Sequence, residues 1–172
     1  ISTISVSGNA LADQTYMSND IQGEVKFKES NLYIKQPLNN IYIKTKFMAE
    51  RIMLDNIMQG LDGYILRVGN VMGRYIDGHF QQNVKENAYV NRLKAIYNLG
   101  AIPEYIKGGY LEFTPVDCLA NSIRKIVFNN NDKNRVFHLF NNKHIPITTF
   151  INICEKLYKK IDILSEDEFN KK

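Results

Sequence analysis

The stretch N-N-I-Y-I-K-T-K-F-M-A-E-R-I-M-L-D-N-I, residues 39–57, predicts an amphipathic helix. Asn39 or Asn40 can cap its start, and Gly60 follows its end. Tyr42 and Lys46 are four residues apart, which places both side chains on one face of a helix, one turn apart. Its apolar residues recur at helical spacing: Ile41, Met48, Ala49, Ile52, Met53 and Ile57.

A Tyr-x-x-x-Lys pair carries little information alone. With ten Tyr and 16 Lys in 172 residues, about one such pair is expected by chance. The weight of Tyr42 and Lys46 therefore depends on the segments that precede and follow them.

Composition is that of a globular protein, with 44% hydrophobic and 23% charged residues. The net charge of +4 is spread along the chain without a basic stripe, which argues against nucleic-acid binding. His79, His138 and His144 are too scattered to predict a metal site. Cys118 and Cys154 lack metal-site spacing and predict buried, reduced thiols. Together with the absence of a signal peptide or a membrane-length apolar run, they predict a cytoplasmic protein.

Strand and helix patterns alternate along the chain. Strands are predicted at 1–8, 64–73, 108–114, 135–140 and 161–164, and helices at 41–59, 79–99, 116–128 and 148–159. Residues 9–40 predict a long surface excursion. This alternation predicts an α/β fold with a parallel sheet. Because the first predicted strand starts at residue 1 and a capped helix has barely begun at residue 165, we expect the chain to be part of a longer domain.

Four segments, in order, resemble the extended short-chain dehydrogenase/reductases. More narrowly, they look like the terminal thioester reductase domains of nonribosomal peptide synthetases. The segments are I-S-T-I-S-V-S-G (1–8), E-S-N-L-Y-I with N-N-I-Y-I-K-T-K-F-M-A-E (29–34, 39–50), L-R-V-G-N-V-M-G-R (66–74) and F-T-P-V-D-C-L-A (113–120). The resemblance implies a Rossmann-like, doubly wound parallel sheet. It also implies that residues 1–172 are the C-terminal portion of one NAD(P)-binding reductase domain, with part of its substrate-binding region.

The resemblance implies roles for individual residues. Thr3 would donate a hydrogen bond to the substrate carbonyl oxygen, and Ser5, expected on the same strand face, would assist. Tyr42 would be the proton donor, and Lys46 would favour its phenolate form and hold the nicotinamide ribose. The alternative for Thr3 and Ser5 is that they are ordinary strand hydroxyls.

The segment from Gly69 to Met72 follows the strand that passes the nicotinamide in this family. The resemblance therefore makes Gly69, Asn70, Val71 and Met72 candidate cofactor contacts, and Asn70 a candidate substrate contact. The alternative is a plain strand-to-loop turn. Asp117 is expected to cap or brace its helix rather than to act in catalysis. No metal ion is implied.

The implied activity is NADPH-dependent release of an acyl or peptidyl thioester as an aldehyde, with further reduction to an alcohol open. The implied partners are a carrier protein bearing a phosphopantetheine thioester and the upstream synthetase modules. Alternatives are a fatty acyl-CoA reductase, a sugar-nucleotide epimerase or dehydratase, or a non-catalytic interaction module on the same scaffold.

One departure from the family concerns the cofactor phosphates. The family seats them at a Gly-x-x-Gly-x-x-Gly turn, and this sequence offers only Gly69-x-x-x-Gly73, after a different strand. We therefore expect these 172 residues alone to bind NADPH poorly and to be inactive. An unpaired sheet edge would favour a homodimer of this segment.

Overall fold

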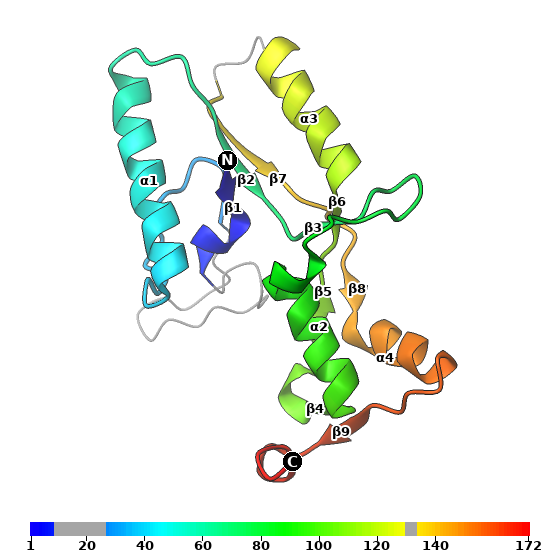
Figure 1. Ribbon diagram of the computed structural model, residues 1–172. Helices are drawn as coiled ribbons and strands as arrows, with labels where there is room; N and C mark the ends of the chain where they lie inside the picture. The colour runs from blue at the N-terminus through cyan, green and yellow to red at the C-terminus, as the bar shows by residue number, and fades with distance from the viewer. Residues whose placement is uncertain (9–26, 130–133) are drawn as a thin grey trace. The chain divides into compact units, whose positions relative to one another are not determined.

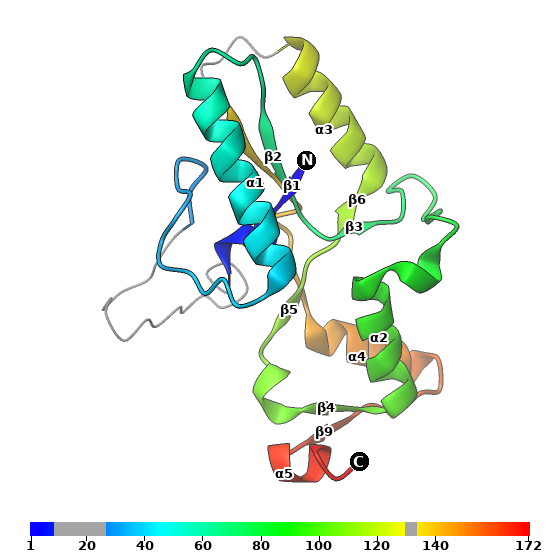
Figure 2. The same cartoon turned by 60° about the vertical axis from the view of Figure 1, so that its left-hand side comes forward.

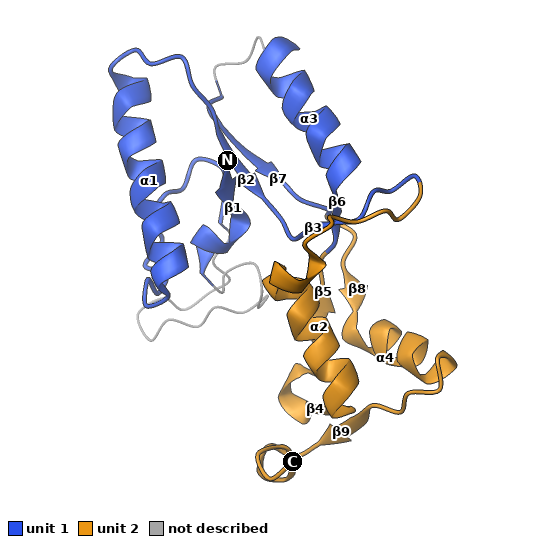
Figure 3. Cartoon of the chain, in the orientation of Figure 1, with its two compact units in different colours: residues 1–76, 113–141 blue, residues 77–112, 142–172 orange. Residues whose placement is uncertain are grey.

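The computed structural model describes residues 1–8, 27–129 and 134–172 (Figure 1). The chain divides into two compact units, coloured in Figure 3. Unit 1 comprises residues 1–76 and 113–141, and unit 2 comprises residues 77–112 and 142–172. The assignment of all 172 residues to one reductase domain stays a prediction.

Unit 1 is built on a parallel sheet in the order β1-β2-β7. Its strands are β1 (Ser2–Thr3), β2 (Ile65–Val68) and β7 (Val136–Leu139). In both Figure 1 and Figure 2 the strands lie between helices α1 (Ile41–Met58) and α3 (Val116–Asn129). The buried side chains of Ile65, Leu66 and Val136 supply its apolar interior. The α/β fold with parallel strands that the sequence predicted is therefore confirmed.

Helix α1 forms where the sequence predicts it. The side-chain oxygen of Asn40 accepts the backbone N–H groups of Tyr42 and Ile43, which would otherwise be unpaired at the helix start. The helix ends before Gly60, whose φ of +103° is a conformation that L residues rarely adopt. Its buried residues, Phe47 and Glu50, pack it against the rest of unit 1.

Four predicted elements in the chain differ from the structure. Of the predicted strand over 108–114, only β5 (Tyr110–Leu111) forms, and Thr114 belongs to a separate strand, β6 (Thr114–Pro115). The predicted strand over 1–8 is cut short at Thr3, because the chain turns into the 3₁₀ helix η1 (Ile4–Ser7). The predicted strand over 64–73 divides into β2 and β3 (Val71–Met72), which pairs with β6 (Thr114–Pro115) in a separate parallel sheet. The helix expected from residue 79 begins later, as α2 (Ala88–Leu99), after the short η2 (Val84–Glu86).

Unit 2 has its own apolar core and two small sheets. The core consists of Ile102, Ile147, Ile151, Cys154 and Ile161. Besides α2, the elements are β4 (Ala101–Pro103), η3 (Glu104–Ile106), β5 (Tyr110–Leu111), β8 (Ile145–Pro146), α4 (Ile147–Lys156), β9 (Asp162–Leu164) and α5 (Glu166–Phe169). Strand β4 pairs with β9 in parallel, and β5 pairs with β8 antiparallel.

Predictions made from local signals at helix ends and at the two cysteines were partly right. Ser165 caps α5 in a capping box with Glu168, as the sequence predicted. Helix α4 starts after Pro146, not at a Thr148 or Thr149 cap. Cys154 is buried as predicted, whereas Cys118 is exposed, so that half of the prediction was wrong.

Across residues 1–8, 27–129 and 134–172, no helix has the length and apolar character needed to cross a membrane. In the same part of the chain, no group of three or more His, Cys, Asp or Glu residues is placed to hold a metal ion.

Candidate active site

Tyr42 and Lys46 come together on α1. The Lys46 ammonium nitrogen lies 6.0 Å from the centre of the Tyr42 ring. Tyr42 is 52% exposed, so a substrate can approach its phenol. The pair is therefore an accessible phenol with a positive charge beside its ring.

Thr3 ends β1 and is buried. Its Oγ1 accepts a hydrogen bond from the backbone N–H of Ser5, 3.2 Å away. Because the Thr3 hydroxyl acts as the acceptor in this bond, it keeps its own proton for donation to another group. Strand β1 packs against α1, and Thr3 directly follows Ser2, whose hydroxyl donates to Glu50 on that helix.

Ser5 does not lie on the strand face predicted for it. The turn into η1 places it after β1, where its backbone N–H is tied to Thr3. The physical reason is local: a Thr hydroxyl at a helix start competes with extended backbone by accepting an N–H two residues on. A substrate contact from Ser5 stays a prediction.

The segment Gly69–Met72 lies between two sheets of unit 1. The Gly69 N–H donates to the Leu139 carbonyl at 3.1 Å, and the Asn70 carbonyl accepts from the Thr114 N–H at 2.9 Å. Val71 and Met72 then form β3. These bonds fix the path of the segment. Cofactor or substrate contacts from this segment stay predictions.

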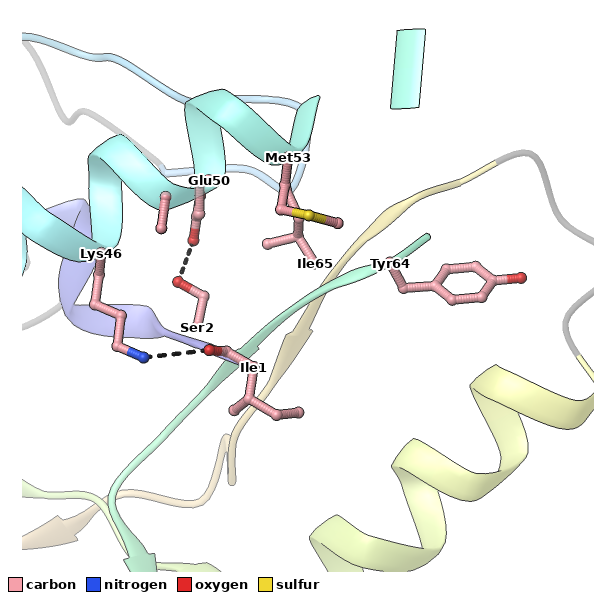
Figure 4. A pocket seen from close by; sticks show the side chains of 8 residues that line it. Ile1, Ser2, Lys46, Glu50, Met53, Tyr64 and Ile65 are labelled. Atoms are coloured by element: carbon pink, nitrogen blue, oxygen red, sulfur yellow. Dashed lines mark hydrogen bonds between the residues drawn. The ribbon is translucent and has the colours of Figure 1, made fainter. Parts of the chain in front are cut away.

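A small pocket of about 150 Å³ opens between α1 and the sheet, beside Lys46 (Figure 4). Inside it the Lys46 ammonium donates to the Ile1 carbonyl at 3.3 Å. The Ser2 hydroxyl donates to Glu50 Oε1 at 2.5 Å. The lining residues are Ile1, Ser2, Lys46, Ala49, Glu50, Met53, Tyr64 and Ile65.

A buried ion pair lies next to these residues, and the sequence reasoning missed it. Arg67 on β2 is fully buried and Glu50 on α1 is 2% exposed. Arg67 Nε is 3.0 and 3.1 Å from the two carboxylate oxygens of Glu50, and Nη2 is 2.8 Å from Oε2. One signal was available: an arginine inside the apolar strand I-L-R-V requires a buried partner.

His138 on β7 completes the surroundings of Arg67. Arg67 Nη1 lies 3.0 Å from His138 Nε2, and since an arginine only donates, Nε2 is the acceptor and the proton sits on Nδ1. The imidazole stacks on Phe27 with ring centres 5.5 Å apart. Burial first, and then the Arg67 charge, lower the pKa of His138. Its backbone N–H donates to Glu29 at 2.7 Å.

We expect His138 to make the fold acid-sensitive. With its pKa lowered in the native state, the unfolded chain takes up a proton at His138 that the native chain resists. This contribution to stability is present above the unfolded pKa, about 6.5, and is lost as the pH falls through the lower native pKa. His138→Gln keeps an acceptor for Arg67 but does not titrate. Denaturant unfolding between pH 8 and about pH 5 should show a smaller loss of stability for this variant than for the wild type. Parallel losses would contradict the expectation.

Asp117 acts as a brace, as the sequence reasoning expected. Its carboxylate accepts the N–H groups of Tyr75, at 2.8 Å, and Cys118, at 3.0 Å, and Ile76 lies at 3.4 Å. These bonds, led by the one from Tyr75, lower the pKa of Asp117. Asp117 therefore ties the loop after β3 to the start of α3.

Known proteins resemble this chain in sequence and in fold. Residues 1–123 match the NAD-binding family described as male sterility protein. A search of curated proteins found no match.

Solved structures resemble the whole chain. A thiolation-reductase di-domain from an archaeal non-ribosomal peptide synthetase is 33% identical, with a TM-score of 0.81, over 99% of this chain and 35% of that one. The reductase domain of the Aureusimine biosynthetic cluster is 27% identical, with a TM-score of 0.78, over 99% of this chain and 43% of that one.

The terminal R domain from the myxalamid PKS-NRPS pathway shows likeness of fold alone. It is 22% identical, with a TM-score of 0.73, over 98% of this chain and 39% of that one. The chain thus spans 35%, 43% and 39% of the length of these three structures.

Proposed function

Because the chain belongs to the NAD-binding family described as male sterility protein, we propose that it carries the proton-donating end of a thioester reductase site. The full protein would reduce an acyl or peptidyl thioester held on a carrier protein. The observation that carries the proposal is the Tyr42–Lys46 contact on a helix that packs against β1, where Thr3 keeps a hydroxyl proton to donate. The archaeal and Aureusimine reductase structures, similar over 99% of the chain, support the substrate class.

The residues present fit a nicotinamide cofactor. Lys46 is a cation that can donate to ribose hydroxyls, since the hydrogen bond of its ammonium to the Ile1 carbonyl, at 3.3 Å, leaves further N–H groups to donate. We propose NADPH as the cofactor, which supplies a hydride when bound. The phosphate-binding turn would lie outside this sequence.

The side chains would act on the oxygen of the substrate. Thr3 would donate a hydrogen bond to the thioester carbonyl oxygen and hold it in place. Tyr42 would transfer its proton to that oxygen as negative charge develops, and the Lys46 ammonium would stabilise the phenolate left behind. The thiohemiacetal would then lose the carrier thiol. In balance, thioester, NADPH and a proton give aldehyde, free thiol and NADP⁺.

The substrate class is tested with the full-length protein. We expect loss of NADPH absorbance, and an aldehyde product, with a carrier protein loaded with an acyl or peptidyl thioester. Unloaded carrier protein is the control, and an NADH arm reports the cofactor preference. No NADPH should be consumed with nucleotide sugars. Epimerisation of a nucleotide sugar without net NADPH consumption would overturn the proposal. Association with a carrier protein and formation of a homodimer both stay predictions.

A further inference from the structure

The buried pair Glu50–Arg67 connects every segment that carries a candidate catalytic residue in unit 1. Glu50 lies on α1, four residues after Lys46 and eight after Tyr42. Its carboxylate accepts from Ser2, the residue before Thr3, and from Arg67, next to Val68 at the end of β2.

The strand register explains why these groups meet. Ser2 lies opposite Arg67 and Thr3 opposite Val68 in the parallel pair β1-β2. Neighbouring residues in a strand point to opposite faces, so Ser2 and Arg67 share the face that meets Glu50. One carboxylate on α1 therefore holds two adjacent strands at a single level of the sheet.

The guanidinium of Arg67 has a partner for each of its five N–H groups. Nε and Nη2 bond Glu50, while the second Nη2 hydrogen reaches the Asn31 carbonyl at 2.8 Å. Nη1 lies within reach of the Lys28 carbonyl, at 3.4 Å, and of His138 Nε2, at 3.0 Å. Phe27 covers the guanidinium at 4.5 Å. A planar group held at every donor cannot slide, so Arg67 is a fixed reference point for α1.

We propose that Glu50 and Arg67 are positioning residues, which set the axial position of α1 and hence the place of Tyr42 and Lys46 relative to Thr3. Tyr42 lies about 12 Å along the helix from Glu50, at about 1.5 Å per residue. Any shift at Glu50 is carried by the rigid helix to the Tyr42 phenol. A misplacement of about 1 Å can reduce the rate by about 10²-fold. The inference rests on the proposed function.

Glu50→Asp is the decisive variant. It keeps the charge, so no buried cation is left unpaired, but it shortens the side chain by one C–C bond, about 1.5 Å. In the full-length protein we expect kcat with the carrier-bound thioester to fall about 10-fold or more, while KM for NADPH stays within about twofold. Val136→Ala is the matched control, since it weakens the same sheet without touching the pair. It should leave kcat unchanged.

The outcomes separate the two proposals. If folded Glu50→Asp keeps the wild-type kcat, or if Val136→Ala lowers kcat equally, the positioning role is overturned. If Glu50→Asp does not fold, Ser2→Ala decides, because it removes only the β1 link to Glu50, and an unchanged kcat overturns the proposal. If the wild type does not reduce thioesters, the proposed function fails. The crystal structure of Glu50→Asp, or of Ser2→Ala if Glu50→Asp does not fold, then decides, and an unmoved Tyr42 relative to Thr3 contradicts the inference.

Discussion

Replacing Tyr42 with Phe should lower kcat of the full-length reductase by about 10²-fold or more, the scale for losing a general acid. The change removes one oxygen atom from a half-exposed side chain, so the fold and the affinity for NADPH should be nearly unchanged. Lys46 would still bind the cofactor, but no proton would be available for the developing oxyanion. Initial-rate assays of NADPH consumption with a loaded carrier protein measure kcat, and direct titration with NADPH measures the affinity for the cofactor.

A matched control is available in unit 2. Tyr97 on α2 also lies near a lysine, with Lys159 Nζ 5.7 Å from its ring centre. Tyr97→Phe makes the same chemical change beside a similar cation, and it should leave kcat unchanged. If Tyr42→Phe turned over at the wild-type rate, the assignment of the acid would be wrong. If Tyr97→Phe lost as much activity, the loss would not be specific to the proposed site.

Sequence reasoning succeeded where a local signal determines the structure. The Asn40 cap located α1, and the apolar run I-L-R-V defined β2. The apolar face expected of α1 was wrong, since Ile41, Met48 and Ile52 are exposed and the buried residues are Phe47 and Glu50. The capping box at Ser165 predicted α5 because its two hydrogen bonds are made within four residues. The Tyr42–Lys46 contact was predictable for the same reason, since one helical turn brings the two side chains together.

Elements that depend on a distant partner were harder to predict. Strands β4 and β8 have three and two residues, and they exist because β9 and β5 pair with them. No periodicity can appear in so few residues. The late start of α2 follows from Asn83 and Asn87, because Asn side chains compete with helix by bonding nearby backbone groups, and Asn87 caps α2 by accepting the N–H of Val90.

The same distinction applies to the candidate site. Tyr42, Lys46 and Thr3 were identified from short motifs, but the groups that hold them in place come from widely separated positions. Glu50 and Arg67 are 17 residues apart, and Arg67 and His138 are 71 apart. The sheet order β1-β2-β7 and the packing of α1 against β1 bring them together, and both are properties of the whole unit.

The Arg67→Met variant should destabilise the fold by about 3–5 kcal/mol, because Glu50 would remain as a buried carboxylate without its cation. Adding Glu50→Leu should restore much of that loss, since an apolar pair of similar volume needs no desolvated charge.

The matched control Arg135→Met removes an exposed ion pair with Asp62, and a ring contact with Tyr64, and should cost only about 1 kcal/mol. Denaturant unfolding of the wild type, Arg67→Met, Glu50→Leu and the double variant gives the coupling energy between Glu50 and Arg67. If the double variant were as unstable as the sum of its single changes, the two side chains would not act as a pair. A restored double variant that remains slow in turnover would instead show that the charged pair serves position more than stability.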